Sequence, residues 1–285
     1  MSRLARDAFD RAAVTYDAHS VLQAEVGRRL LDHLEGLRID PEVVLDLGCA
    51  TGAGLDGLRG KFPRASLVGL DFSTAMLHRA AARTPWWRRL IGRAATPLVC
   101  ADAHRLPLKS ASVHLVFSNL MLQWCEPATV FAEAARVLPA GGLFMFSTFG
   151  PDTLKELRAA FAGVGAADRV NAFIDMHDLG DALVHAGFAD PVMDMEYITL
   201  TYATPRAMLR ELKGLGATNA LAGRSRGLYG KAAFARAEAA LETTRRDGRI
   251  AATFEVIYGH AWKVQGKRTR EGHAIVHFDP AAGRS

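Results

Sequence analysis

A glycine-rich loop follows a run of β-forming residues near the start of the chain. The segment VVLDLGCATGAGL, residues 43–55, places Gly48, Gly52 and Gly54 directly after an apolar run. Such turns let backbone N–H groups approach a ligand closely, and the next helix then presents its N-terminus. The Gly-Lys-Ser/Thr of a P-loop is missing, and the spacing from Asp46 is D-x-G-x-A-x-G. The loop therefore predicts a ligand site of another kind.

Polar residues end three further β-rich runs. Asp71 ends the run 66–71, Asp102 follows 97–101, and Asn119 follows 113–118. In doubly wound sheets the ligand lies beyond the carboxyl ends of the strands, where a carboxylate can hold the hydroxyls of a ribose. A second carboxylate and the next backbone N–H can address adenine. Each residue alone could simply be a helix N-cap, but their order along the chain predicts a nucleoside-binding crevice.

The elements that must position these residues alternate between β-rich and helical stretches, which indicates βαβ units. Strands are expected at 42–47, 66–71, 97–101, 113–118, 142–148, 192–202 and 254–264, and helices at 1–40, 127–138, 151–161, 176–187, 204–214 and 231–246. The predicted fold is α/β, with a doubly wound, Rossmann-like, mostly parallel sheet of seven strands. We divide the chain into an N-terminal helical flap (1–40), a binding core (41–150), a part that completes the sheet and adds helices around the substrate (151–265), and a tail (266–285).

Composition excludes several classes of protein. No apolar run approaches the ~18 residues that cross a bilayer, and the N-terminus lacks the apolar region of a secretory signal. The three cysteines have no C-x-x-C spacing, which argues against disulfides and zinc and suits a reducing cytoplasm. The net charge of +5 suggests an acidic partner, although a solvated basic surface is the ordinary alternative.

Together these motifs resemble the class I S-adenosylmethionine-dependent methyltransferases over about residues 42–150. By that resemblance Gly48 and Gly52 lie beside the methionine part of S-adenosylmethionine. The same resemblance implies that Asp71 binds the ribose and that Asp102 and Ala103 contact the adenine. Asp46 chiefly orients the loop. The remaining cofactor-contacting positions that the resemblance implies are Cys49, Phe72, Met76, Asn119 and Leu120. Ala50 stands where the family usually has glycine, which calls for a small adjustment of the backbone.

The flanking blocks narrow the resemblance. AFDRAAVTYDAHSVLQ (8–23), FSNLMLQWC (117–125) and LKGLGATNALAGR (212–224) are similar to the malonyl-acyl-carrier-protein O-methyltransferases that begin pimelate assembly for biotin. That family implies an acidic acyl carrier protein as partner. Blocks 149–157 and 176–183 also resemble a related respiratory-complex assembly factor that hydroxylates a protein arginine, which is the alternative function.

Methylation of a malonyl thioester would need few residues that act on the substrate. Its carboxylate is already ionised at neutral pH, so attack on the sulfonium methyl needs positioning and desolvation and no general base. A cation or phenol that holds the carboxylate is expected, and Tyr16 and Lys213 fall in the distinctive blocks. Tyr16 could instead only close the crevice, and Lys213 could be a solvated charge. No metal cluster is expected, and the NLML turn after the fourth strand lowers the odds of nucleic-acid methylation.

Overall fold

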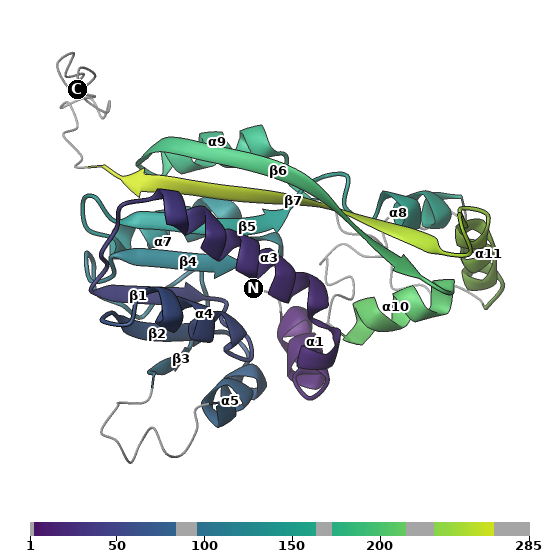
Figure 1. Cartoon of the computed structure of the whole chain (residues 1–285), viewed down its shortest axis with the longest axis horizontal. Helices are drawn as coiled ribbons and strands as arrows, with labels where there is room; N and C mark the ends of the chain where they lie inside the picture. The colour runs from purple at the N-terminus through teal and green to yellow at the C-terminus, as the bar shows by residue number, and fades with distance from the viewer. Residues whose placement is uncertain (1–2, 84–95, 164–172, 215–230, 265–285) are drawn as a thin grey trace.

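The computed structural model describes residues 3–83, 96–163, 173–214 and 231–264. One seven-stranded sheet in the order β3-β2-β1-β4-β5-β7-β6 dominates these residues (Figure 1). Its strands are β1 (Val43–Leu47), β2 (Ser66–Asp71), β3 (Leu98–Cys100), β4 (Leu115–Asn119), β5 (Leu143–Phe149), β6 (Phe188–Tyr202) and β7 (Ile250–Lys263). The first five strands pair in parallel and β7 is antiparallel to both neighbours. The predicted α/β fold is confirmed.

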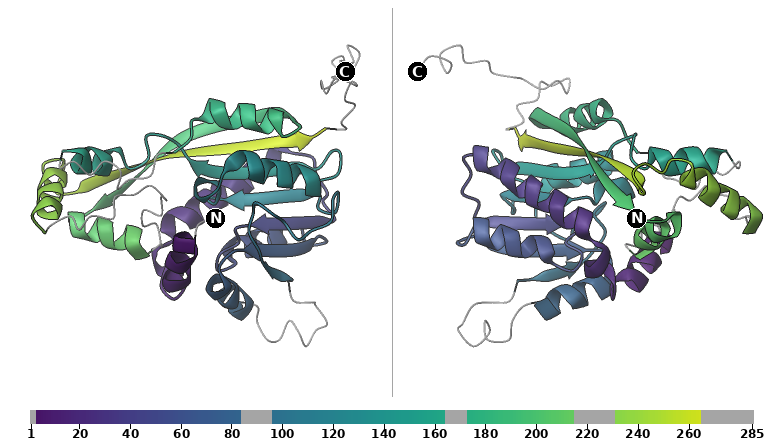
Figure 2. Two further views of the ribbon diagram at one scale, coloured as in Figure 1. Left: turned by 180° about the vertical axis from the view of Figure 1, so that it is seen from behind. Right: turned by 45° about the vertical axis from the view of Figure 1, so that its right-hand side comes forward.

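Helices cover both faces of the sheet, as crossover connections between parallel strands require. They are α1 (Arg3–Ala12), α2 (Tyr16–His19), α3 (Val21–His33), α4 (Ala53–Lys61), α5 (Thr74–Arg83), α7 (Pro127–Val137), α8 (Lys155–Ala162), α9 (Met176–His185), α10 (Pro205–Gly214) and α11 (Lys231–Glu242), with 3-10 turns η1 (Leu34–Gly36) and η2 (Leu122–Trp124). Helices α3 and α4 share one hydrophobic cluster with the sheet, and α7 and α9 share a second cluster on the opposite face. Figure 2 shows these two layers from behind and in an oblique view.

The first forty residues depart from the expected continuous helix. The chain breaks between α1 and α2 and again before α3. The hydroxyls of Thr15 and Ser20 donate to the carbonyls of Ala12 and Asp17, three residues earlier. Such local side-chain bonds compete with regular helix. The breaks divide the flap into short segments that can turn around the end of the sheet.

The last two strands form a long ribbon that extends past the rest of the sheet. β5 pairs with β7 only from Val256 onward, whereas β6 and β7 stay paired as far as Tyr202 and Ile250. The far end of the ribbon carries α8, α10 and α11 (Figure 1). Both strands begin before the predicted ranges, and the register of β6 shifts between Ala189 and Val192, around Pro191. Pro191 has no N–H for a regular ladder, so an irregularity there is expected.

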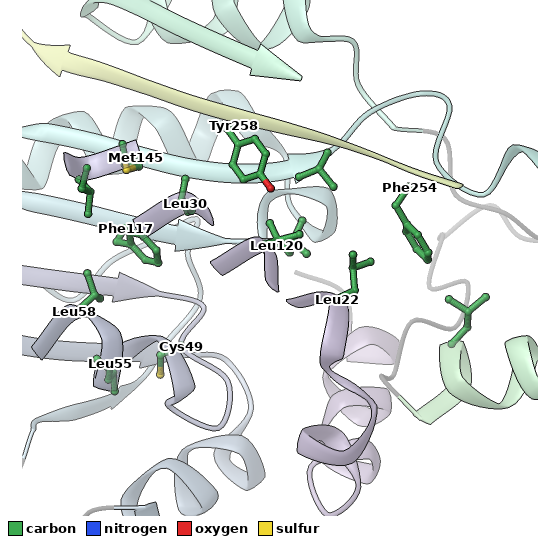
Figure 3. Close-up of a cluster of buried hydrophobic side chains, with 14 of the residues drawn as sticks. Leu22, Leu30, Cys49, Leu55, Leu58, Phe117, Leu120, Met145, Phe254 and Tyr258 are labelled. Atoms are coloured by element: carbon green, nitrogen blue, oxygen red, sulfur yellow. The ribbon is translucent and has the colours of Figure 1, made fainter. Parts of the chain in front are cut away.

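Helix α3 joins the N-terminal segment to this ribbon. Arg29 of α3 donates to Glu196 of β6, and the Tyr258 hydroxyl of β7 donates to the same carboxylate at 2.6 Å. The His33 ring stacks on Tyr258 with centroids 4.8 Å apart. Apolar contacts continue this layer: Figure 3 shows Leu22 and Leu30 of α3 in one buried cluster that reaches Phe254. The flap is therefore anchored to the ribbon formed by β6 and β7.

Several sequence features lie outside the described residues. They include Trp86, Trp87 and the arginines at 88, 89 and 93, most of the 212–224 block, and the tail after residue 265.

Candidate functional site

A pocket lies where the carboxyl ends of β1, β2 and β4 meet the N-terminal flap. The pocket is open to solvent, and the empty space within it and its mouth is about 480 Å³. Its lining consists of Phe9, Tyr16, Leu47, Gly48, Ala50, Leu70, Asp71, Phe72, Ala101, Ala103, Asn119, Leu120, Met121 and Trp124. The structure thus brings together seven of the residues singled out from the sequence: Tyr16, Gly48, Asp71, Phe72, Ala103, Asn119 and Leu120.

The glycine-rich loop owes its shape to left-handed backbone conformations. Gly48 and Gly52 both have φ of 84°, and Ala50 has φ of 44°. The N–H groups of Gly48 and Cys49 both donate to the carbonyl of Leu70, which fastens the loop to β2. A Cβ on Gly48 would lie 2.5 Å from Cγ of Met121, so this position has no room for a side chain. Ala50 adopts a conformation that favours glycine, which costs an L-residue about 1–2 kcal/mol.

Asp71 is the acidic centre of the pocket. Its carboxylate accepts the N–H of Ala50 at 2.9 Å and the N–H of Ser73 at 2.8 Å. Burial raises the pKa of Asp71 to about 6, although these N–H groups act in the opposite direction. Because each carboxylate oxygen can accept more than one hydrogen bond, Asp71 retains capacity for ligand hydroxyls.

Asp46 lies beneath the loop and away from the pocket lining. Its side chain is buried, and Oδ2 has no hydrogen-bond partner among the described residues. Burial, together with the nearby Asp71 carboxylate, raises the pKa of Asp46 to about 7. A Cβ on Gly54 would lie 2.9 Å from Oδ2, so α4 packs closely over this carboxyl group. This placement suits the supporting role expected from the sequence.

Asp102 stands at the rim, next to the pocket-lining Ala101 and Ala103. Its Oδ1 accepts the backbone N–H of His104 at 3.0 Å and lies 2.6 Å from Nδ1 of the same residue. Nε2 of His104 in turn accepts the N–H of Glu126 at 3.0 Å. Burial acts to raise the pKa of Asp102, but the bonds from His104 hold it well below its usual range. The carboxylate is thus ionised and oriented.

Asn119 lines the pocket, but its side chain also supports the fold. Nδ2 donates to the carbonyl of Gln23 at 2.9 Å, and Oδ1 accepts the Ser147 hydroxyl at 2.8 Å. These bonds tie the end of β4 to α3 and β5. The next residue, Leu120, has φ of 49°, and this turn directs the chain across the crevice.

An aromatic wall closes one side of the pocket. Phe9 of α1 meets Phe72 at 5.6 Å and Trp124 at 5.2 Å between ring centroids, both edge to face. Trp124 falls in the 117–125 block and lines the pocket. The contribution of Phe9 was missed, although Phe9 begins the distinctive F-x-R-A-A block.

Carboxylates of the flap bind the pocket's loops. Asp17 accepts the Thr51 hydroxyl at 2.5 Å and pairs with Arg83 of α5 at 2.7 Å. Asp10 accepts the Ser73 hydroxyl at 2.5 Å. Arg79 of α5 donates to the carbonyls of Ala13 and Val14. The flap therefore closes over the site in this structure.

Tyr16 comes from this flap and faces the pocket. Burial, followed by the carboxylates of Asp71 and Asp17, raises the pKa of Tyr16 above its ordinary value. Its hydroxyl therefore stays protonated at neutral pH. Within the described part of the chain no side chain or backbone group bonds this hydroxyl, so it can serve as a donor.

Five of the candidate residues lie outside the pocket lining: Asp46, Cys49, Gly52, Met76 and Lys213, in addition to the rim residue Asp102. The Cys49 side chain belongs to the hydrophobic cluster near Leu55 (Figure 3). Gly52 lies against α5, where an added Cβ would be 3.0 Å from that of Ala80. Met76 is fully buried. Lys213 is exposed on α10, a helix that contacts α2.

Among the described residues, no group of three or more histidine, cysteine or acidic side chains is placed to hold a metal ion. Within the same ranges, no helix has the length and apolar character needed to span a bilayer.

Comparison with known proteins identifies the family. Residues 45–146 match the model of the methyltransferase domain. The malonyl-[acyl-carrier protein] O-methyltransferase of Gallionella capsiferriformans is 52% identical, over 95% of this chain and 94% of the relative. The enzyme of the same name from Laribacter hongkongensis is 51% identical, over 97% and 95%. The chain belongs to this family.

Solved structures support the fold of this family member. The YcgJ protein of Bacillus subtilis matches with a TM-score of 0.57 and 13% identity, over 84% of this chain and all of that one. Geranyl diphosphate C-methyltransferase of Streptomyces coelicolor, in complex with S-adenosyl-L-homocysteine, matches with 0.50 and 16%, over 84% and 78%. At these identities the likeness concerns the sheet and its helices, and confirms the Rossmann-like methyltransferase architecture.

Proposed function

We propose that the chain transfers a methyl group from S-adenosylmethionine to the free carboxylate of malonyl-acyl carrier protein. The observation that carries this proposal is a pocket that combines the Asp71 carboxylate, an aromatic wall and the Tyr16 hydroxyl of a closed flap. The names of the relatives at about 50% identity point to the same substrate. The product would be the methyl ester that primes pimelate assembly for biotin.

The pocket residues fit S-adenosylmethionine. Asp71 would accept from the ribose hydroxyls, and Asp102 with Ala103 would contact the adenine. Phe72 and Leu120 offer apolar surface for the ring. At Gly48 and Ala50 only backbone atoms and one methyl group would lie beside the methionine part of the cofactor. The loop and the helix behind these two residues would be supported by Asp46, Cys49, Gly52 and Met76. When bound, the cofactor supplies an electrophilic methyl group.

The carboxylate of the substrate must be oriented toward the methyl group. The protonated Tyr16 hydroxyl would donate to one carboxylate oxygen and leave the other directed at the methyl group. The aromatic wall and the closed flap exclude water, which strengthens that contact. Lys213 is the second candidate for holding the carboxylate, from α10 next to the flap. No proton moves in this transfer, since the carboxylate is already ionised.

The assay is incubation with methyl-labelled S-adenosylmethionine and malonyl-acyl carrier protein, followed by mass analysis of the carrier protein. We expect the malonyl-carrier protein to gain the mass of one methyl group. The acetyl carrier protein has no carboxylate and is the control. A mass gain of one oxygen on a protein arginine, with the malonyl thioester unmodified, would instead support the hydroxylase alternative, which the names of the relatives do not favour.

A further inference from the structure

Exposed basic side chains lie on two helices, of which α1 lines the pocket and α10 contacts α2. Arg206 and Arg210 are exposed on α10, and Arg3 and Arg11 are exposed on α1. Within the described ranges, Arg3, Arg11 and Arg210 form no ion pair or side-chain hydrogen bond. Arg206 pairs with Glu238 of α11 at 2.9 Å, yet its side chain remains 78% exposed. We call these four residues the basic surface.

Arginines on other described helices are commonly neutralised by a neighbour. Arg28 of α3 pairs with Glu25 and Asp32. Arg136 pairs with Glu133, and Arg245 with Glu242. Three of the four arginines of the basic surface, Arg3, Arg11 and Arg210, differ from these pairs because they have no acidic partner among the described residues.

The spacing of buried and basic residues along α10 shows which face of the helix carries the basic side chains. Met208 and Leu212 are buried on one side of the helix. Arg206 and Arg210 are four residues apart, so they lie on a common face, and that face is roughly opposite the buried one. Lys213 shares this exposed face but belongs to the substrate proposal above.

α1 lines the pocket, and α10 lies one helix away from it. α1 contributes Phe9 to its lining, and α10 contacts α2, which contributes Tyr16. Figures 1 and 2 show α10 beside α1 in every view. A macromolecule that rests on the basic surface is thus one helix away from the site where its attached thioester would react.

We propose that the basic surface is the docking site for the acidic carrier protein that delivers the malonyl thioester. This inference rests on the proposed function. The carrier holds its thioester on a flexible arm, so it must sit near the mouth of the pocket for the arm to enter. An acidic partner matches the unpaired arginines in charge, which speeds encounter and fixes orientation.

The test compares two substrates that share the reacting group. Arg210→Glu and the double variant Arg3→Glu/Arg210→Glu are assayed with malonyl-acyl carrier protein and with malonyl-pantetheine. We expect KM for the carrier-protein substrate to rise roughly 10-fold or more, with a weaker dependence on salt. We expect kcat, and kcat/KM for malonyl-pantetheine, to remain within about two-fold.

Lys109→Glu is the matched control. Lys109 is exposed on the β3–β4 connection, near the end of α7 and away from the basic surface, and it undergoes the same change of charge. Its KM for the carrier-protein substrate should equal that of the parent. Binding of labelled carrier protein, followed by fluorescence anisotropy, gives a readout that does not depend on turnover.

The outcomes separate the two proposals. If the parent methylates malonyl-acyl carrier protein and both variants keep its KM, its salt dependence and its anisotropy curve, the docking site is wrong. If the parent methylates neither thioester, the proposed function fails. Anisotropy then still decides whether the arginines bind the carrier protein.

Discussion

The hydroxyl of Thr51 in the glycine-rich loop donates to the carboxylate of Asp17 in the N-terminal flap at 2.5 Å. This bond joins the two segments that enclose the pocket from opposite sides. A ligand that leaves the loop must therefore pass the flap, and the flap is bonded to that same loop.

Thr51→Val should speed release of S-adenosylmethionine. The change keeps the shape of the side chain but removes one hydrogen bond, worth about 0.5–1.5 kcal/mol, while Asp17 retains Arg83. We expect the dissociation rate, measured by stopped-flow fluorescence, to rise by roughly 3- to 10-fold. Thr243→Val is the matched control, since the Thr243 hydroxyl donates to a carbonyl within α11. Equal release rates for Thr51→Val and the parent would show that this bond does not hold the flap.

Tyr16→Phe should reduce turnover of malonyl-acyl carrier protein and keep cofactor affinity within a few-fold. Losing a hydrogen bond to a charged group costs about 1.5–3 kcal/mol, which corresponds to a roughly 10- to 100-fold lower kcat. Because the pKa of Tyr16 is raised, the parent rate at saturating cofactor should not change between about pH 7 and 9. Tyr197→Phe, on the exposed face of β6, should keep the parent rate. If kcat of Tyr16→Phe equals that of the parent, the Tyr16 hydroxyl does not hold the carboxylate and the ring only covers the pocket.

Lys213→Ala should lower kcat more than Tyr16→Phe does, because it removes a full charge from the carboxylate contact. Lys213→Arg, which keeps the charge, should recover part of the activity. Steady-state kinetics with malonyl-acyl carrier protein separates kcat from KM, and calorimetry checks that cofactor binding is intact. Turnover at the parent rate would mean that another group, such as an arginine of the lobe formed by α8, α10 and α11, holds the carboxylate.

Ala50→Gly should stabilise the protein or leave it unchanged. Glycine relieves the left-handed conformation at φ of 44°, a gain of up to about 1 kcal/mol after its own entropic cost. Urea unfolding measures the difference. Ala81→Gly, at an exposed position within α5, should lose about 1 kcal/mol. A loss at residue 50 as large as that at 81 would contradict the assignment of strain to the loop.

Asp46→Asn should flatten the pH dependence of stability. With a pKa of about 7 in the folded protein and ~3.9 in the unfolded chain, Asp46 binds more protons in the folded state between these values. The free energy of unfolding of the parent should therefore fall as pH rises through this window, with ~1.4 kcal/mol for each pH unit as the upper bound for one group. Asp71, at about 6, adds to the slope over the lower part of the window.

Urea unfolding of the parent and Asp46→Asn at about pH 5 and pH 8 tests this sign. Asp247→Asn is the matched control in an exposed turn, where φ of 48° suits asparagine. If the parent gains stability on going to the higher pH and Asp46→Asn shows the same gain, Asp46 is ionised throughout.

The sequence predicted most of the sheet because its strands carry a local signal. The apolar run 66–71 coincides with β2, and the polar residue that follows each central strand falls at one edge because the strands are parallel. Asp71 and Asn119 meet in the pocket for that reason. The full length of β6 was less evident, since Pro191 interrupts the strand pattern at the register shift.

Contacts between distant segments were not predictable in the same way. Asp17 and Thr51 are separated by 34 positions, and no periodicity relates a flap carboxylate to a loop hydroxyl. Nothing in the sequence likewise indicates that the ring of His104 links Asp102 to the turn before α7. These bonds depend on how the flap and the sheet pack, which only the assembled structure shows.

The anchoring of α3 to β6 and β7 has a consequence for biosynthesis. Arg29 and His33 emerge early from the ribosome, yet their partners Glu196 and Tyr258 are among the later residues to be translated. Domains fold as units while the chain lengthens, so the β1–β5 core and the bonds between the flap and its loops can form before these two contacts of α3 exist. The anchoring of α3 is therefore complete only after β6 and β7 have been translated.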